Sequence, residues 1–226
     1  AKWDSILAEA PWNIAFELLR SSKDPAIEIA CERGRREAWN LEMGPGNRDE
    51  VREGIHRRLS DFMNKGRLPE NAVLIGGPPC QAYSVVGRSR NRGTEGYRAE
   101  NDHRHFLYRE YLQVIHHFRP AVFVMENVKG MLSSRVADRQ IFHTIMSDLK
   151  RPDLACNSDV GLEYVLVALP RAPSTLFDPE PDDFIVEAES FGVPQARHRV
   201  VVCGVRRDVF DKARGVQRLK PTSPPT

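Results

Sequence analysis

The chain has 226 residues and a formal net charge of +2 at pH 7, with 41% hydrophobic and 28% charged residues. This length and balance are ordinary for a soluble protein with one large α/β domain, and they argue against a disordered chain. Because the net charge is so small, any attraction to nucleic acid must come from a local cluster of basic residues. The sequence has neither an apolar run long enough to span a bilayer nor an amino-terminal signal pattern, so we expect no membrane partner.

Residues 1–70 are predicted to be mainly helical, because apolar side chains recur at helical spacing. Val51, Ile55, Leu59 and Phe62 follow this spacing toward the end of the region. We expect them to line one face of packing helices in the amino-terminal part of a catalytic domain.

A short apolar run at 72–75 is followed by two glycines and two prolines, which predicts a fully buried parallel strand that ends in a tight turn. Cys80 comes directly after that turn, at the carboxyl end of the strand. Ligands bind and chemistry occurs at this edge of open α/β sheets. A single cysteine is more commonly a small core residue than a nucleophile, so the thiol alone leaves both interpretations open.

Two further strands carry polar residues at their ends. The apolar run 121–128 predicts a strand with Glu126 and Asn127 near its carboxyl end. A predicted helix precedes this strand and ends before Pro120. The segment 192–199, Gly-Val-Pro-Gln-Ala-Arg-His-Arg, leads into the apolar run 200–205. Arg197 and Arg199 alternate at the start of that strand, which predicts that they face the same side.

The segment 87–98 is a basic, glycine-containing loop. Four arginines stand there against the single acid Glu95, and three glycines accompany them. Flexibility and positive charge suit a loop that closes over a phosphate backbone, whose neutralisation makes binding salt-dependent. An ordinary solvated arginine loop is the alternative.

Together, Pro-Cys-Gln at 79–81, Glu-Asn-Val at 126–128 and Gln-x-Arg-x-Arg at 195–199 resemble the C5-cytosine-specific DNA methyltransferase family, which carries these motifs in this order. The resemblance covers residues 71–208. It implies an α/β fold with a Rossmann-like, doubly wound sheet of the S-adenosylmethionine-dependent methyltransferase type. It further implies S-adenosylmethionine as cofactor, double-stranded DNA as partner, and a bacterial restriction-modification setting in the cytoplasm or nucleoid.

The resemblance also assigns roles to individual residues. Cys80 would add to C6 of a flipped-out cytosine, Glu126 would stabilise the activated ring, and Arg197 would orient it. The expected substrate-binding residues are Gln81, Ser84, Arg88, Arg90, Asn127, Gln195 and Arg199. Pro78 and Pro79 are the expected cofactor contacts. For Ser84, a simple turn hydroxyl is an equal alternative.

Some parts of the family pattern are not found. The family places a glycine-rich cofactor element ahead of Pro-Cys-Gln, and the sequence has none there. We expect residues 1–70 to be the helical amino-terminal part, 71–210 the catalytic core, and 211–226 a proline-rich linker toward a missing target recognition domain. The chain would then be truncated, with its missing domains or a second subunit as partner.

The sequence leaves two alternative functions open and predicts no metal site. A relative that methylates cytosine in tRNA would share the Pro-Cys-Gln and Glu-Asn-Val pair. A catalytically silent fragment that binds DNA or a partner would keep the fold without holding cofactor. No metal is expected, because the clustered histidines do not bring three ligands onto one ion. These histidines are His103, His105, His116 and His117.

Overall fold

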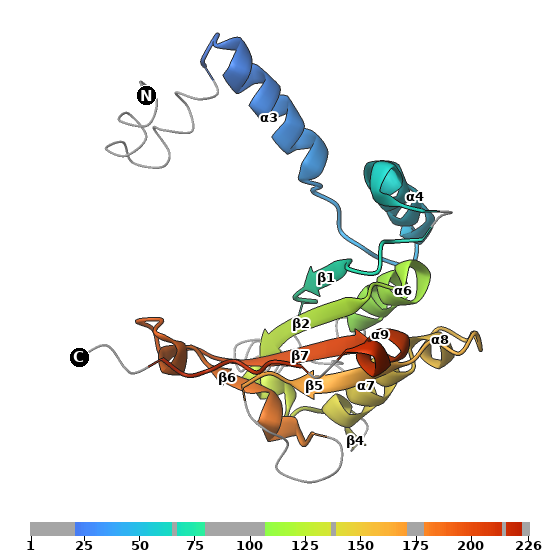
Figure 1. The fold of residues 1–226 in the computed structure, drawn as a ribbon, viewed down its shortest axis with the longest axis vertical. Helices are drawn as coiled ribbons and strands as arrows, with labels where there is room; N and C mark the ends of the chain where they lie inside the picture. Colours follow the sequence, from blue (N-terminus) through green and yellow to red (C-terminus); the bar gives the residue numbers. More distant parts are fainter. Residues whose placement is uncertain are drawn as a thin grey trace, which may run out of the picture. The chain divides into compact units, whose positions relative to one another are not determined.

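A computed structural model describes residues 21–64, 67–79, 107–136, 139–170, 179–213 and 216–222 (Figure 1). The chain separates into two compact units, Ala1–Glu42 and Met43–Thr226. The described part of the first unit contains one helix, α3 (Pro25–Glu37). Its first turn is capped by Asp24, whose carboxylate accepts a hydrogen bond of 2.9 Å from the amide of Ala26.

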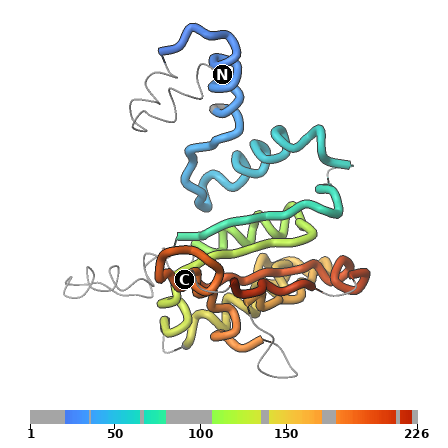
Figure 2. Tube along the Cα trace, turned by 60° about the vertical axis from the view of Figure 1, so that its left-hand side comes forward, coloured from blue at the N-terminus to red at the C-terminus, as the bar shows by residue number. Residues whose placement is uncertain are grey.

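The second unit is built on a mixed sheet. Its strand order is β1-β2-β7-β5, from β1 (Val73–Gly76), β2 (Val122–Val128), β7 (His198–Arg206) and β5 (Tyr164–Ala168). β1 and β2 are parallel, whereas β7 is antiparallel to β2 and β5. Figure 2 shows the β1 trace running alongside β2. The α/β class and the Rossmann-like sheet predicted from the sequence are confirmed.

The shorter elements complete this unit. The strand β6 pairs with the first residues of β7, and β3 and β4 form a separate two-stranded ribbon. The remaining elements are β3 (Arg135–Val136), β4 (Arg139–Gln140), β6 (Ile185–Glu187), α8 (Pro152–Ala155), α9 (Arg207–Lys212), η1 (Ser60–Phe62), η4 (Lys129–Met131), η5 (Pro181–Phe184) and η6 (Ala188–Phe191). In the described part of the chain, no helix has the length and apolar content needed to cross a membrane.

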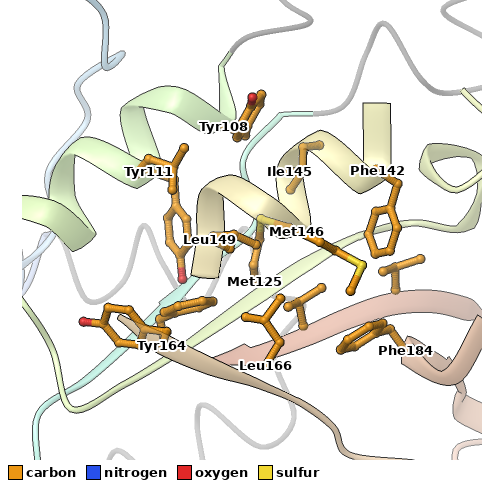
Figure 3. Close-up of a cluster of buried hydrophobic side chains, with 14 of the residues drawn as sticks. Tyr108, Tyr111, Met125, Phe142, Ile145, Met146, Leu149, Tyr164, Leu166 and Phe184 are labelled. Atoms are coloured by element: carbon orange, nitrogen blue, oxygen red, sulfur yellow. The ribbon is translucent and has the colours of Figure 1, made fainter. Parts of the chain in front are cut away.

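The hydrophobic core lies between one face of the sheet and the helices α6 (Tyr108–Phe118) and α7 (Ile141–Lys150). Along β2, Phe123 and Met125 are fully buried, and the alternate residues are half-buried. Figure 3 shows Met125 close to side chains from both helices. α6 ends at Arg119, which adopts a left-handed conformation, and Pro120 follows, as the sequence predicts.

The prediction that β1 is fully buried is wrong. Val73 is 56% exposed and Ile75 is 75% exposed. Among the described strands β1 pairs with β2 alone, so it forms an edge of the sheet. The apolar run predicts that a strand forms, but it does not indicate whether other elements cover both faces of that strand.

The region before β1 contains the helix α4 (Arg48–Leu59), on which Val51, a residue of the predicted apolar face, is buried. Phe62 departs from the predicted apolar face, with 70% of its surface exposed. The reason is that Phe62 belongs to the 3₁₀ turn η1, where three residues complete a turn and the helical spacing no longer holds.

A charged pair joins α4 to α6. Arg48 donates from Nε to Glu110 Oε2 at 2.7 Å and from Nη2 to the other carboxylate oxygen, and Glu110 is only 6% exposed. Replacing Arg48 by methionine would leave the Glu110 carboxylate without its bidentate partner. We expect the free energy of unfolding to fall by about 2 kcal/mol, less than for a fully buried pair because Arg48 is partly solvated.

Urea unfolding followed by circular dichroism would measure this loss. The matched control is Arg52→Met on the same helix, because Arg52 pairs with Asp49 at the surface, where 80% of the Asp49 side chain is exposed. We expect the control to change stability by less than about 0.5 kcal/mol. Equal effects of the two substitutions would show that the Arg48–Glu110 pair has no special role.

Candidate functional site

Several predicted site residues lie outside the described residues, and their roles stay predictions. They are Cys80, Gln81, Ser84, Arg88 and Arg90. The described part of the turn after β1 ends at Pro79, which is exposed, and Pro78 before it is half-buried.

The parallel pairing of β1 and β2 brings the two motif-bearing strand ends to the same edge of the sheet. Asn127, at the end of β2, donates from Nδ2 to the carbonyl of Pro78 at 3.1 Å. Its Oδ1 accepts from the amide of Val128 at 2.9 Å, and the residue is only 4% exposed. Asn127 thus fastens the turn after β1 to the end of β2, and its predicted contact with substrate stays a prediction.

Gly77 explains how closely the turn approaches the neighbouring strand. A Cβ at Gly77 would lie 3.2 Å from Glu126 Oε2, which is tighter than nine in ten such contacts in proteins. A side chain here would press on the predicted catalytic carboxylate. The glycine pair at 76–77 therefore has a steric function in addition to ending the strand.

Glu126 forms an ion pair with Arg199, with 2.9 Å between Arg199 Nε and Glu126 Oε1. The antiparallel register sets Arg199 opposite Val128 and Val201 opposite Glu126, so these four side chains share one face of the sheet. The pair is partly solvated, because 25% of the Arg199 side chain and 45% of the Glu126 side chain are exposed. Solvent access of this kind suits a carboxylate that must meet a substrate.

Arg197 and Gln195 lie in the connection before β7. Both are exposed, and the amide of Gln195 donates to the carbonyl of Val193 at 2.7 Å in a tight turn. β7 begins at His198, so strand alternation does not determine the side that Arg197 faces. The structure thus joins Pro78, Glu126, Asn127 and Arg199, and the positions of Arg197 and Gln195 relative to substrate stay predictions.

Two other cysteines are unsuited to act as thiolate nucleophiles. Burial raises the pKa of Cys203 to about 11, and the residue is 5% exposed within β7. Burial is also the main reason that the pKa of Cys156 is raised. Both thiols are therefore protonated at neutral pH, and the thiolate is the reactive form of cysteine.

One contact beside the third motif was not predicted from the sequence. Glu189, in η6, approaches His198, the residue between the two arginines of the third motif, with 2.6 Å between Glu189 Oε1 and His198 Nε2. Neither residue belongs to a recognisable motif position. Only the hairpin formed by β6 and β7 brings them together.

Comparison with known proteins agrees with this arrangement of motifs. The family model described as C-5 cytosine-specific DNA methylase matches residues 47–161, which include the ends of both β1 and β2. This match spans half of the chain. The chain belongs to this family.

Curated relatives of the C-5 cytosine-specific methylase chain are named type II methyltransferases. One from Bacillus paralicheniformis is 30% identical over 158 residues, covering 66% of this chain and 28% of the relative. One from Desulfomicrobium norvegicum is 30% identical, covering 60% and 25%. One from Picosynechococcus is 31% identical, covering 59% and 43%. The matched part of the chain therefore spans between 25% and 43% of the length of these relatives.

The described residues fit the cofactor of this family only in part. Pro78 and Pro79 lie at the carboxyl end of β1, where the ligands of open α/β sheets bind. Ahead of β1, the described ranges contain no strand followed by a glycine-rich turn that could take the adenosine end. They form at most one side of a pocket for S-adenosylmethionine.

Proposed function

We propose that this chain carries the catalytic residues of a DNA (cytosine-5)-methyltransferase of the restriction-modification type. S-Adenosylmethionine, when bound, supplies the methyl group that is transferred to C5. The observation that supports the proposal most directly is the pairing of Glu126 with Arg199 beside the turn that precedes Cys80. Three motifs that are distant in the sequence contribute residues to this one region, where β1 and β2 end and β7 begins.

In the proposed reaction, the Cys80 thiolate adds to C6 of cytosine, and the electrons of the C5–C6 double bond become available at C5. Glu126 hydrogen-bonds the ring at N3 and the exocyclic amine as negative charge develops. Arg197 orients the base, and Arg199 keeps Glu126 in place through their ion pair. After C5 has taken the methyl group, loss of its proton to water and elimination of the thiolate restore the aromatic ring and free Cys80.

The base must leave the stacked duplex before C6 can be attacked, at a cost of a few kcal/mol. The basic loop at 87–98 is the proposed source of compensating phosphate contacts, and Asn127, Gln195, Gln81 and Ser84 are the proposed contacts around the flipped nucleotide. The proposed location is the bacterial cytoplasm or nucleoid.

Removing two arginines of this loop tests its contact with phosphate. The double substitution Arg88→Ala and Arg90→Ala is expected to flatten the plot of log affinity against log salt, by about 0.9 for each phosphate that is no longer neutralised. Fluorescence anisotropy with one duplex at several salt concentrations would measure the slope. Arg207→Ala with Lys212→Ala on α9, at the other end of β7, is the matched control and should leave the slope unchanged. An unchanged slope in the loop variant would rule out phosphate binding there.

Covalent trapping tests the proposed chemistry as a whole. The chain is incubated with S-adenosylmethionine and a duplex that contains 5-fluorocytosine, and the products are resolved by denaturing mass spectrometry. Fluorine cannot leave C5 as a cation, so the intermediate should persist as an adduct on Cys80 that carries the methyl group. Methylation of an ordinary duplex without any trapped adduct would contradict the covalent route.

The same assay separates the two other candidate functions. An adduct that forms with tRNA and not with duplex DNA would identify an RNA-methylating relative. Failure to bind S-adenosylmethionine in calorimetry, together with no adduct on either substrate, would overturn the proposed activity and identify a silent fragment. The calorimetric measurement is necessary because the matched part of this chain spans only 28% and 25% of the length of two of its relatives.

A further inference from the structure

A single carboxylate is bonded to two consecutive residues of the third motif. Glu189 Oε1 lies 2.6 Å from His198 Nε2, and its Oε2 accepts from the amide of Arg197 at 3.3 Å. An ionised carboxylate can only accept hydrogen bonds, so His198 carries its proton on Nε2 in this contact. The hydrogen bond from Glu189's own backbone amide, followed by that from His198, lowers the pKa of the carboxyl and keeps it ionised at neutral pH.

These two bonds act on an exposed segment that backbone hydrogen bonds also restrain: the amide of Gly192 donates to the carbonyl of Glu189, and the amide of Val193 donates to the carbonyl of Ala188. Residues 192–197 are exposed in the connection between η6 and β7. The chain turns at Gly192, which has a φ of 82°, and the amide of Ala188 donates to the carbonyl of Arg197 at 3.1 Å. Glu189 therefore restrains Arg197 and His198, the residues at which the connection ends and β7 begins.

From His198 the contacts continue to the predicted catalytic carboxylate. Arg199 donates from Nη1 to the carbonyl of His198 at 2.8 Å, and its Nε pairs with Glu126 Oε1 at 2.9 Å. The four residues thus form a continuous chain of short contacts from η6 to the end of β2. Displacing the His198 backbone would move the acceptor that orients the Arg199 guanidinium.

We infer that Glu189 is a positioning residue that sets the placement of Arg197 and Arg199 for catalysis through its bonds to the Arg197 amide and the His198 ring. This inference rests on the proposed methyl transfer. Glu189 itself touches neither base nor cofactor in this scheme. Its contribution to overall stability is small, because 41% of its side chain and 37% of the His198 side chain are exposed. Substitutions at Glu189 should therefore leave the protein folded.

The test combines a kinetic and a structural measurement. Glu189→Ala is expected to lower kcat/KM for duplex methylation about tenfold, with an unchanged thermal midpoint. Glu189→Gln keeps an oxygen that can accept from one of the two donors, so it should recover part of the loss. Glu187→Gln changes a nearby acid whose backbone pairs with His198 but whose side chain makes no hydrogen bond or ion pair in the described ranges, so it is the charge control and should retain full activity.

Amide hydrogen exchange provides a measurement that does not depend on activity. The Arg197 amide should exchange about tenfold faster in Glu189→Ala than in the unsubstituted chain, because its acceptor has been removed. His198→Ala should lower kcat/KM, and combining it with Glu189→Ala should add little further loss if both act through the same contact. Fully additive losses, or unchanged exchange at Arg197, would overturn the inference.

The outcomes also distinguish this inference from the proposed function. If the unsubstituted chain methylates no substrate, the proposed activity fails, while exchange at Arg197 still decides whether Glu189 restrains the segment. If the chain is active and Glu189→Ala accelerates exchange without lowering kcat/KM, the contact is structural only. That result would overturn the positioning role and leave the methyltransferase assignment intact.

Discussion

Replacing Cys80 by serine is expected to lower methyl transfer by about 10⁴-fold or more while leaving the fold intact. A serine hydroxyl is far less nucleophilic than a thiolate, and no base is proposed to activate it. Tritium transfer from S-adenosylmethionine to duplex DNA would measure the loss, and circular dichroism would verify the fold. The trapped adduct with 5-fluorocytosine DNA should disappear in the same variant.

Cys31→Ser is the matched control for this substitution, because Cys31 lies on α3 in the other compact unit. It should retain full activity. Methyl transfer by the Cys80→Ser chain at a rate within tenfold of the unsubstituted chain would contradict the nucleophile assignment. The protonated state of Cys156 and Cys203 makes rescue by either thiol unexpected.

Replacing Gly204 by valine is expected to be the most damaging single change to the fold. Gly204 lies opposite Phe123 in the β2–β7 register, and even a Cβ at this position would overlap the Phe123 ring. Phe123 is fully buried against Tyr164, with 5.0 Å between their ring centroids, so the ring has little room to move. We expect the free energy of unfolding to fall by about 4 kcal/mol or more.

Urea unfolding monitored by circular dichroism would measure this effect. Gly34→Ala is the control, since a Cβ at Gly34 meets no atom within 4 Å and alanine favours the helix. Combining Gly204→Ala with Phe123→Leu should recover part of the stability that Gly204→Ala alone removes, because the smaller side chain makes room for the Cβ. No loss of stability in Gly204→Val would show that β7 does not pack on Phe123 as described.

The sequence predicts the elements of the candidate site better than their partners. The end of β2 at Glu126 and Asn127 follows from a local apolar run, and the helix before it from the spacing of its apolar residues. The ion pair of Glu126 with Arg199 depends on β7 inserting in antiparallel direction between β2 and β5. No local pattern contains that information, because pairing between distant strands is decided by tertiary packing.

Local sequence patterns also do not predict which residues are buried or which distant residues are in contact. The exposure of Ile75 depends on which strands and helices cover β1, and the four residues of that strand do not indicate this. Glu189 has no motif position, and its function depends on a hairpin that returns it to His198. The glycine pair before Cys80 indicates a turn, whereas the close approach of Gly77 to Glu126 follows only from the pairing of β1 with β2.

The position of β7 in the sheet has a consequence for how the protein is made. β7 joins β2 to β5, yet it is the last of the described strands along the chain. During synthesis β1 and β2 can pair early, while β5 meets β7, its partner among the described strands, only after residue 206 has left the ribosome. Such long-range pairing is slow. The Glu126–Arg199 contact therefore cannot form before β7 has been synthesised, and a nascent chain stalled before β7 would expose the unpaired edges of β2 and β5 to chaperones and proteases.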